Sequence, residues 1–373
     1  MSIPIQKRVR LDLQAGDNQV LPMRPESLSA KRSSLNVTVS PSVRSGQSDR
    51  SMNLDIKERW SGEEDVAQVQ RFNKTLAWLP RLRIRSRIKP RAIQALLRVS
   101  QIGGSNKLRK HGLEAESRVV GLPGASVPVR ILRPAVKPKG VVLDFHGGGW
   151  VIGNAQMNDG FNVAIVKSRD VAVVSVDYRL AVSTAIEDVM EDCLSAARWL
   201  LSEDDCREFA DLPVIVVGES AGGHLAVATL LALKRWPELL QRVKGTVLYY
   251  GVYDLTGTPS VRAAPPETLL LDGPGMVEAF RMLTPDMTDV QRRQPPLSPL
   301  YGDFTGLPPA LMFAGELDPL RDDTVEIAHR WDMSAPVEVH LLPHCPHGFI
   351  HFPTRTAASV LAYSREWISS RLG

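Results

Sequence analysis

The chain has 373 residues, of which 43% are hydrophobic, so it can bury one large core and a smaller subdomain. Its formal net charge of +4 is modest and gives no reason to expect a nucleic-acid partner. The three cysteines, Cys193, Cys206 and Cys345, follow no regular spacing, which argues against a disulfide framework and against a zinc site.

The first residues do not show the pattern that is typical of a signal peptide. Residues 1–8 lack the apolar stretch of a signal peptide, and no apolar run in the chain is long enough to cross a bilayer. We therefore expect a cytoplasmic protein without stable membrane insertion. Residues 1–55 are rich in Ser, Arg, Gln, Pro and Asn, which predicts a flexible N-terminal extension.

Residues 56–116 are predicted to be largely helical, because apolar side chains recur there every three to four positions. Within this region, residues 81–89 alternate basic and apolar side chains. Such a run is compatible with a membrane-surface or nucleic-acid patch, or with a solvated basic face beside a buried one. The second interpretation is favoured, since the run is short and no aromatic residues interleave it.

Residues 117–373 alternate strands and helices. This order predicts an α/β fold with a mostly parallel sheet covered by helices on both faces. Ligands of such sheets bind at the carboxyl ends of the strands. The predicted strands are 117–120 and 127–132 (a hairpin), 141–145, 171–176, 214–217, 246–250, 310–314 and 337–341; the predicted helices are 158–168, 184–201, 221–233, 320–332 and 354–372.

One interval breaks this alternation. Residues 255–306 contain no predicted strand, a proline-rich start and one helical piece at 276–283. The interval is too long for a plain connection, so we expect a cap insertion over the active-site face.

The most informative motif is Gly-x-Ser-x-Gly around Ser220, which joins the strand 214–217 to the helix 221–233. A sharp turn from strand to helix strains the central residue and requires small neighbours, here Gly218 and Gly222. The serine hydroxyl would then be exposed at the end of the sheet. An ordinary strand-to-helix turn with a serine cap is the alternative, so the hypothesis depends on finding partners for Ser220.

An activated serine needs a base, an orienting acid and an oxyanion hole. His347 follows the last predicted strand, with His344 as its competitor. His351 is predicted to be a solvated or packing residue, and His224 a packed core residue. Asp318 follows the strand 310–314, although it could simply cap the next helix. Its competitors are Glu316, Asp322 and Asp323.

The candidate oxyanion loop is residues 146–150, His-Gly-Gly-Gly-Trp, directly after the strand 141–145. Consecutive glycines let backbone amides turn toward one point, where the amide of Ala221 could join them. His146 is expected to hold this loop by hydrogen bonding. A phosphate-binding loop is disfavoured because no Gly-Lys-Ser/Thr follows.

Together these segments resemble the bacterial hormone-sensitive-lipase-like esterases, lipolytic family IV of the α/β-hydrolase fold. The resemblance covers about residues 120–373. The matching motifs are 146–150 (HGGGW), 176–181 (VDYRLA), 218–223 (GESAGG), 318–320 (DPL) and 347–349 (HGF).

The resemblance implies Ser220 as nucleophile, His347 as base and Asp318 as orienting acid. It implies Gly148, Gly149 and Ala221 as oxyanion donors, and a helical cap built from residues 56–116 and the insertion 255–306. The family usually has Asp where Glu219 stands. Because a carboxylate is kept, we expect Glu219 to support the site through an altered hydrogen bond. The loop after Ala181 departs from the family pattern.

The sequence therefore predicts a serine carboxylesterase that acts on small, short-acyl esters through an acyl-enzyme, without cofactor or metal. The expected partner is a small-molecule ester and not nucleic acid, and a homodimer is compatible with the resemblance. An amidase or thioesterase with the same triad, a non-catalytic receptor on this fold, and a lipid-surface lipase remain alternatives.

Overall fold

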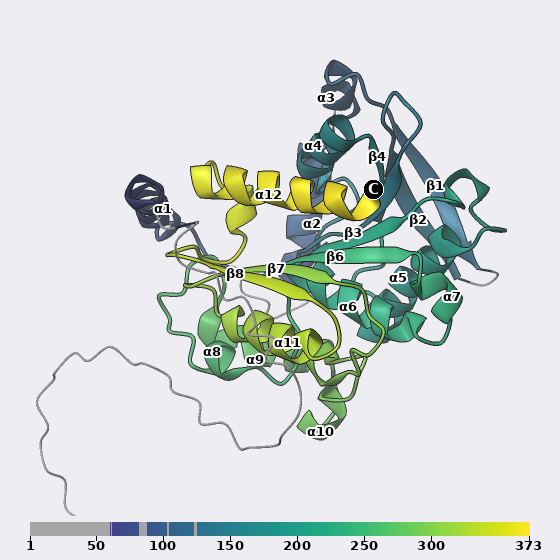
Figure 1. Cartoon of the computed structure of the whole chain (residues 1–373). Coiled ribbons are helices and arrows are strands. Elements are labelled where there is room, and N and C mark those ends of the chain that lie inside the picture. Colours follow the sequence, from purple (N-terminus) through teal and green to yellow (C-terminus); the bar gives the residue numbers. More distant parts are fainter. Residues whose placement is uncertain (1–59, 61, 82–87, 103, 123–124) are drawn as a thin grey trace, which may run out of the picture. The chain divides into compact units, whose positions relative to one another are not determined.

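A computed structural model describes residues 60, 62–81, 88–102, 104–122 and 125–373 (Figure 1). The expected extension at 1–55, the tip of the first hairpin and most of the basic run lie outside these residues. The described chain contains an eight-stranded sheet in the order β1-β2-β4-β3-β5-β6-β7-β8. The strands are β1 (Ala115–Leu122), β2 (Ala125–Leu132), β3 (Gly140–Phe145), β4 (Val171–Val176), β5 (Val214–Glu219), β6 (Val243–Tyr249), β7 (Ala310–Gly315) and β8 (Val337–Leu342).

The sheet is mostly parallel, as the alternation of strands and helices predicts. Only β1 and β2 run antiparallel to their neighbours, and β3 to β8 are paired in parallel. The five central strands β3 to β7 are apolar along nearly their whole length because both faces of the sheet are covered.

Helices pack on both faces and divide the core into two clusters. Val141 and Leu143 of β3 face one cluster, and Val142 between them faces the other. The first cluster includes α5 (Ile186–Leu201), α6 (Ala221–Leu233) and α11 (Arg321–Asp332). The second includes α1 (Glu63–Leu76), α4 (Asp159–Arg169) and α12 (Arg355–Leu372). The alternation along β3 is the period of a strand buried on both sides.

The interval between β6 and β7 contains short helices and no strand, as predicted. It includes α9 (Met276–Leu283), which coincides with the predicted helical piece. The other elements are α8 (Pro259–Arg262), η2 (Gly273–Gly275), α10 (Asp289–Arg292) and η3 (Pro299–Tyr301). Side chains of this interval form one wall of the cavity described below.

The N-terminal helical region consists of separate helices. They are α1, α2 (Ile88–Ser100) and α3 (Gly104–Lys110), all within the region that was predicted to be largely helical. The remaining elements are α7 (Pro237–Leu240), η1 (Arg207–Phe209) and η4 (Phe349–His351). Across the described ranges, no helix combines the length and apolar character that a bilayer crossing requires.

Candidate active site

Ser220 stands at a sharp turn between β5 and α6, with φ +52° and ψ −120°. The turn forces close backbone contacts, as the motif predicted. A Cβ atom on Gly218 would lie 2.3 Å from the carbonyl oxygen of Gly222, and one on Gly222 would lie 1.9 Å from that of Phe145. These distances leave no room for a side chain, so both glycines are needed to bring α6 against β5 and β3.

His347 connects Ser220 to Asp318. The Ser220 hydroxyl donates to Nε2 of His347 over 2.9 Å, and Nδ1–H of His347 donates to Oδ2 of Asp318 over 2.8 Å. Both partners of the serine are buried. The other carboxylate oxygen of Asp318 accepts the backbone N–H of Leu320 over 2.8 Å in a local turn, but α11 begins at Arg321 and no side chain caps it, so Asp318 is not the helix cap that was considered.

The competing acids are engaged elsewhere. Glu316 accepts the backbone N–H of His344, and Asp322 accepts that of Ser260. Asp323 accepts the N–H groups of Tyr253 and Asp254, and burial raises its pKa to about 7.

The competing histidines also have other contacts. His344 has φ +55°, and its carbonyl accepts from the Asn73 amide. His224 is fully buried, as predicted: it accepts from the Trp150 indole over 3.2 Å and donates to the Leu297 carbonyl over 2.9 Å. Burial lowers its pKa to about 4, which keeps the imidazole neutral.

The glycine loop presents unpaired amides to the cavity. Gly148 and Gly149 have φ of +103° and +60°, and a Cβ atom on Gly148 would lie 2.1 Å from the Ile152 carbonyl oxygen. Among the described residues, no acceptor pairs with the N–H groups of Gly148, Gly149 or Ala221. Gly148 and Gly149 line the cavity, and Ala221 follows Ser220 as the first residue of α6.

His146 is placed to hold this loop in shape. Its Nδ1–H donates to the Gly147 carbonyl over 2.7 Å, and its ring stacks on Tyr178 with centroids 4.1 Å apart. The Tyr178 hydroxyl donates to the carbonyl of His146 over 2.7 Å. Burial lowers the pKa of His146 to about 4, so a neutral ring occupies this position.

Glu219 makes contacts that the sequence did not reveal. Its Oε2 accepts from the Tyr250 hydroxyl over 2.9 Å and from Nε2 of His351 over 2.6 Å. Although burial opposes it, the positive charge of His351 helps to hold the carboxyl pKa below its usual range, and Glu219 in turn raises the pKa of His351. Tyr250 also packs against the ring of His347, with centroids 4.7 Å apart.

The prediction that His351 is a solvated or packing residue was therefore incomplete. Its side chain is 44% exposed, but it is also an ionic partner of the residue next to Ser220. The available signals were the replacement of Asp by Glu at position 219 and a second histidine shortly after His347.

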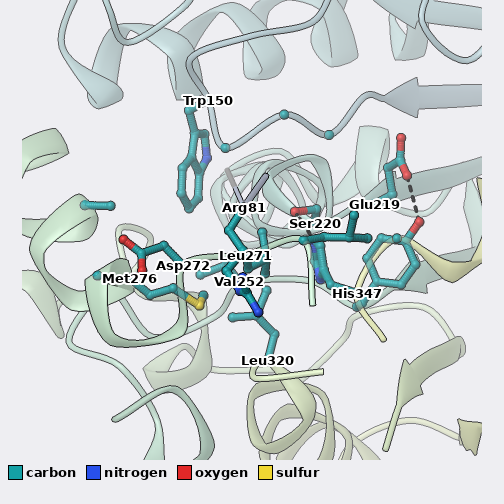
Figure 2. A pocket seen from close by; sticks show the side chains of 18 of the residues that line it. Arg81, Trp150, Glu219, Ser220, Val252, Leu271, Asp272, Met276, Leu320 and His347 are labelled. Atoms are coloured by element: carbon teal, nitrogen blue, oxygen red, sulfur yellow. Dashed lines mark hydrogen bonds between the residues drawn. The ribbon is translucent and has the colours of Figure 1, made fainter. Parts of the chain in front are cut away.

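These groups border a cavity of about 820 Å³ (Figure 2). Ser220, His347 and Glu219 lie on one side of it, and Met276 and Asp272 lie across from them. Trp150 is both buried and part of the cavity wall. The wall is otherwise mainly apolar and includes Ile93, Met157, Val252, Leu271, Phe280, Leu283 and Leu320. Within the described ranges, no three His, Cys, Asp or Glu side chains are grouped as a metal site would require.

Comparison with known proteins agrees with the fold and with the site described above. Residues 142–351 match the family model of the alpha/beta hydrolase fold. A carboxylesterase of Mycobacterium tuberculosis, NlhH, is 30% identical over 266 residues, which are 68% of this chain and 81% of that protein. The esterase LipW of Mycobacterium marinum aligns with a TM-score of 0.72 at 25% identity, covering 83% of this chain and 97% of that one.

A third structure, an esterase from the bacterial hormone-sensitive lipase family, shares the fold with a TM-score of 0.66 at 23% identity. It covers 84% of this chain and 100% of the other. The chain belongs to the alpha/beta hydrolase family and is a carboxylic ester hydrolase.

Proposed function

We propose that this protein is a serine carboxylesterase in which Ser220, His347 and Asp318 form the catalytic triad. The observation that carries the proposal is the continuous hydrogen-bonded path from Ser220 Oγ through the His347 ring to Asp318. It uses the two ring nitrogens in the order that proton transfer requires: Nε2 faces the serine, and Nδ1–H is held by the acid.

The first half of the reaction acylates Ser220. Its Oγ attacks the ester carbonyl while His347 Nε2 takes the hydroxyl proton, and Asp318 stabilises the resulting imidazolium. The carbonyl oxygen becomes negative and is stabilised by the N–H groups of Gly148, Gly149 and Ala221. The C–O bond to the alcohol then breaks, and the alcohol leaves with the proton from His347.

In the second half, water replaces the alcohol. His347 removes a proton from the water as it attacks the acyl carbonyl, and the same amides stabilise the second oxyanion. Collapse returns the proton to Ser220 Oγ and releases the acid. Each oxyanion donor typically contributes about 10²- to 10³-fold to turnover. Glu219 and His146 support the site without touching the reacting atoms.

The preference for small esters with short acyl chains rests on the family resemblance. The cavity of about 820 Å³ can hold both halves of such an ester against apolar walls. We propose that α2, α9 and the rest of the interval between β6 and β7 act as the cap that determines which ester fits, because their side chains contribute to that wall.

The test is the hydrolysis of p-nitrophenyl esters of increasing acyl length by the wild type and by Ser220→Ala. The matched control is Ser168→Ala, which removes an exposed hydroxyl on α4. Activity that peaks at short chains, disappears in Ser220→Ala and survives in Ser168→Ala supports the proposal. Activity that survives in Ser220→Ala contradicts the triad, and a folded wild type that hydrolyses none of the esters contradicts the esterase function.

A further inference from the structure

Helix α2 packs on the protein through polar side chains. The Gln94 side-chain amide exchanges two hydrogen bonds with the backbone of Gly153, over 2.8 and 2.7 Å. Just past the end of the helix, Gln101 exchanges two with the side chain of Asn154, over 3.0 and 2.6 Å. Arg91 donates to the Val182 carbonyl over 3.1 Å. The inward side of α2 is therefore fixed by directed polar contacts.

The outward side of α2 carries large apolar side chains beside exposed arginines, whereas a surface helix usually turns its apolar side chains toward the core. Leu96 and Val99 are 69% and 61% exposed, and Ile102, just past the helix, is 79% exposed. Ile93 is partly exposed on the same outward side. A cluster of exposed apolar side chains on one helix marks an interaction surface and not a random scatter.

The apolar surface continues toward the cavity. Ile93 lines the cavity wall, together with Pro80 and Arg81. Directly before Pro80 in the chain stand Trp78 and Leu79, which are 90% and 48% exposed. An object that covers this surface would therefore lie beside the cavity that contains Ser220.

Charge selects the kind of partner. Residues 80–112 contain ten Lys and Arg and no Asp or Glu, in a chain whose formal net charge is only +4. Among the described members, Arg98 is exposed on α2, as is Arg91 although it also donates to the Val182 carbonyl, and Arg81 lies at the cavity, where it donates to the Thr268 carbonyl. A second copy of the chain would bring the same positive charge and be repelled. A duplex would satisfy the cations but leave the apolar side chains in water.

We propose that α2 and the adjoining residues Trp78 and Leu79 form a surface that binds reversibly to membranes containing anionic lipids. The apolar side chains enter the boundary between headgroups and acyl chains, and the basic side chains lie at the level of the anionic headgroups. Binding would place the cavity next to the lipid, so that esters dissolved in the membrane reach it directly. This inference goes beyond the proposed function and does not depend on ester turnover.

The test is co-sedimentation of the full chain with vesicles, either of phosphatidylcholine alone or with added phosphatidylglycerol. The test variant is Leu96→Gln combined with Val99→Gln, which keeps good helix formers on the solvent side of α2. The matched control is Val119→Gln combined with Val290→Gln, which makes the same kind of change at exposed positions of β1 and α10. Circular dichroism confirms that each variant is folded.

The proposal predicts that the wild type and the control bind phosphatidylglycerol vesicles, bind phosphatidylcholine weakly, and are released by high salt. The test variant should bind at least about tenfold more weakly, since each apolar side chain buried in lipid contributes about tenfold. Absence of binding to either vesicle, or equal binding by the test variant and the control, would overturn the proposal. The proposal would also be overturned if the chain did not bind vesicles and instead associated with itself, or bound duplex DNA, in a way that Leu96→Gln and Val99→Gln abolish.

Discussion

Glu219 connects Ser220, Tyr250 and His351 through its position in the chain and its side-chain contacts. It precedes Ser220, accepts from Tyr250, which packs against His347, and pairs with His351 in η4. The backbone N–H of Gly147 also helps to lower its pKa, although Glu219 Oε1 has no hydrogen-bonding partner among the described residues. A shorter Asp would not extend as far toward His351, which gives the replacement of Asp by Glu a structural reason.

Replacement of His351 by Gln tests this pairing through its pH dependence. Glu219 raises the His351 pKa above 6.5 in the folded state, so the pair stabilises the fold fully below pH 6.5, and this contribution is lost as the pH rises through the raised value. Near neutral pH we expect His351→Gln to lower the free energy of unfolding by about 1 kcal/mol, a small effect because solvent screens this half-exposed pair.

The measurement is urea unfolding of the wild type and His351→Gln across neutral and alkaline pH. The difference between them should shrink as the pH rises. NMR titration of the His351 ring should give a pKa above 6.5 that falls in Glu219→Gln. A stability difference that grows with pH, or a His351 pKa that does not respond to Glu219→Gln, would show that the pair is not ionic.

At the scale of elements, the junction of β5 and α6 sets the position of Ser220. The close approach of Gly222 to the Phe145 carbonyl holds α6 against β3, so the serine and the glycine loop that follows β3 are placed by the same contact. The positions of the proposed nucleophile and of the proposed oxyanion donors are therefore coupled.

Replacement of Gly222 by Ala should push α6 away from β3. A Cβ atom would stand 1.9 Å from backbone that cannot move freely, so we expect a loss of stability of about 3 kcal/mol or more and a large loss of activity. The matched control is Gly160→Ala in α4, where a Cβ atom meets nothing within 4 Å. That change should leave activity intact and stabilise the protein by about 0.5 kcal/mol. Thermal unfolding of Gly222→Ala and Gly160→Ala compares their stabilities. Equal stability of the two variants would contradict the claim that the junction of β5 and α6 has no room for a side chain at Gly222.

The sequence predicted the elements that have a strong apolar period. The bounds of β4 and α6 coincide with the prediction, because continuous β-branched runs and a glycine-bounded turn leave few alternatives. The helical character of the N-terminal region was predicted, but the orientation of α2 was not, since Gln94 faces the protein while Leu96 and Val99 face solvent. Apolar periodicity indicates a helix, but it does not show which side packs inward where polar side chains make the contacts.

The site was predictable to the same degree. Ser220, Asp318 and His347 stand in motifs, and the structure brings them together. The partnership of Glu219 with His351 spans 132 residues, and no local pattern encodes a contact over that separation. Outside the helical piece at 276–283, the interval between β6 and β7 shows no period from which its other cavity-lining residues could be chosen.

At the scale of the whole molecule, buried titratable groups set the response to acid. His146 and His224 are neutral in the folded protein, because burial lowers the pKa of each to about 4. They take up protons on unfolding, so their contribution to stability is present above pH 6.5 and is lost as the pH falls toward 4. Asp144 and Asp323 act in the opposite direction, because burial raises their pKa values to about 6 and about 7.

Replacement of His224 by Gln isolates one of these contributions. Gln can still accept from the Trp150 indole and donate to the Leu297 carbonyl, but it does not titrate. Between pH 6.5 and about 4, the wild type should lose about 3 kcal/mol of stability relative to His224→Gln, which is the expected effect of a pKa lowered from 6.5 to about 4. Urea unfolding at several pH values measures this difference. A difference independent of pH would show that folding does not lower the pKa of His224.

The account as a whole depends on Ser220 being the nucleophile. The most direct measurement is reaction of the full chain with an alkyl fluorophosphonate, followed by intact-mass analysis and peptide mapping. We expect one adduct per chain, located on Ser220, absent in Ser220→Ala, and formed much more slowly in His347→Gln because the base is missing. An adduct on another residue, or unchanged labelling of Ser220→Ala, would contradict the account.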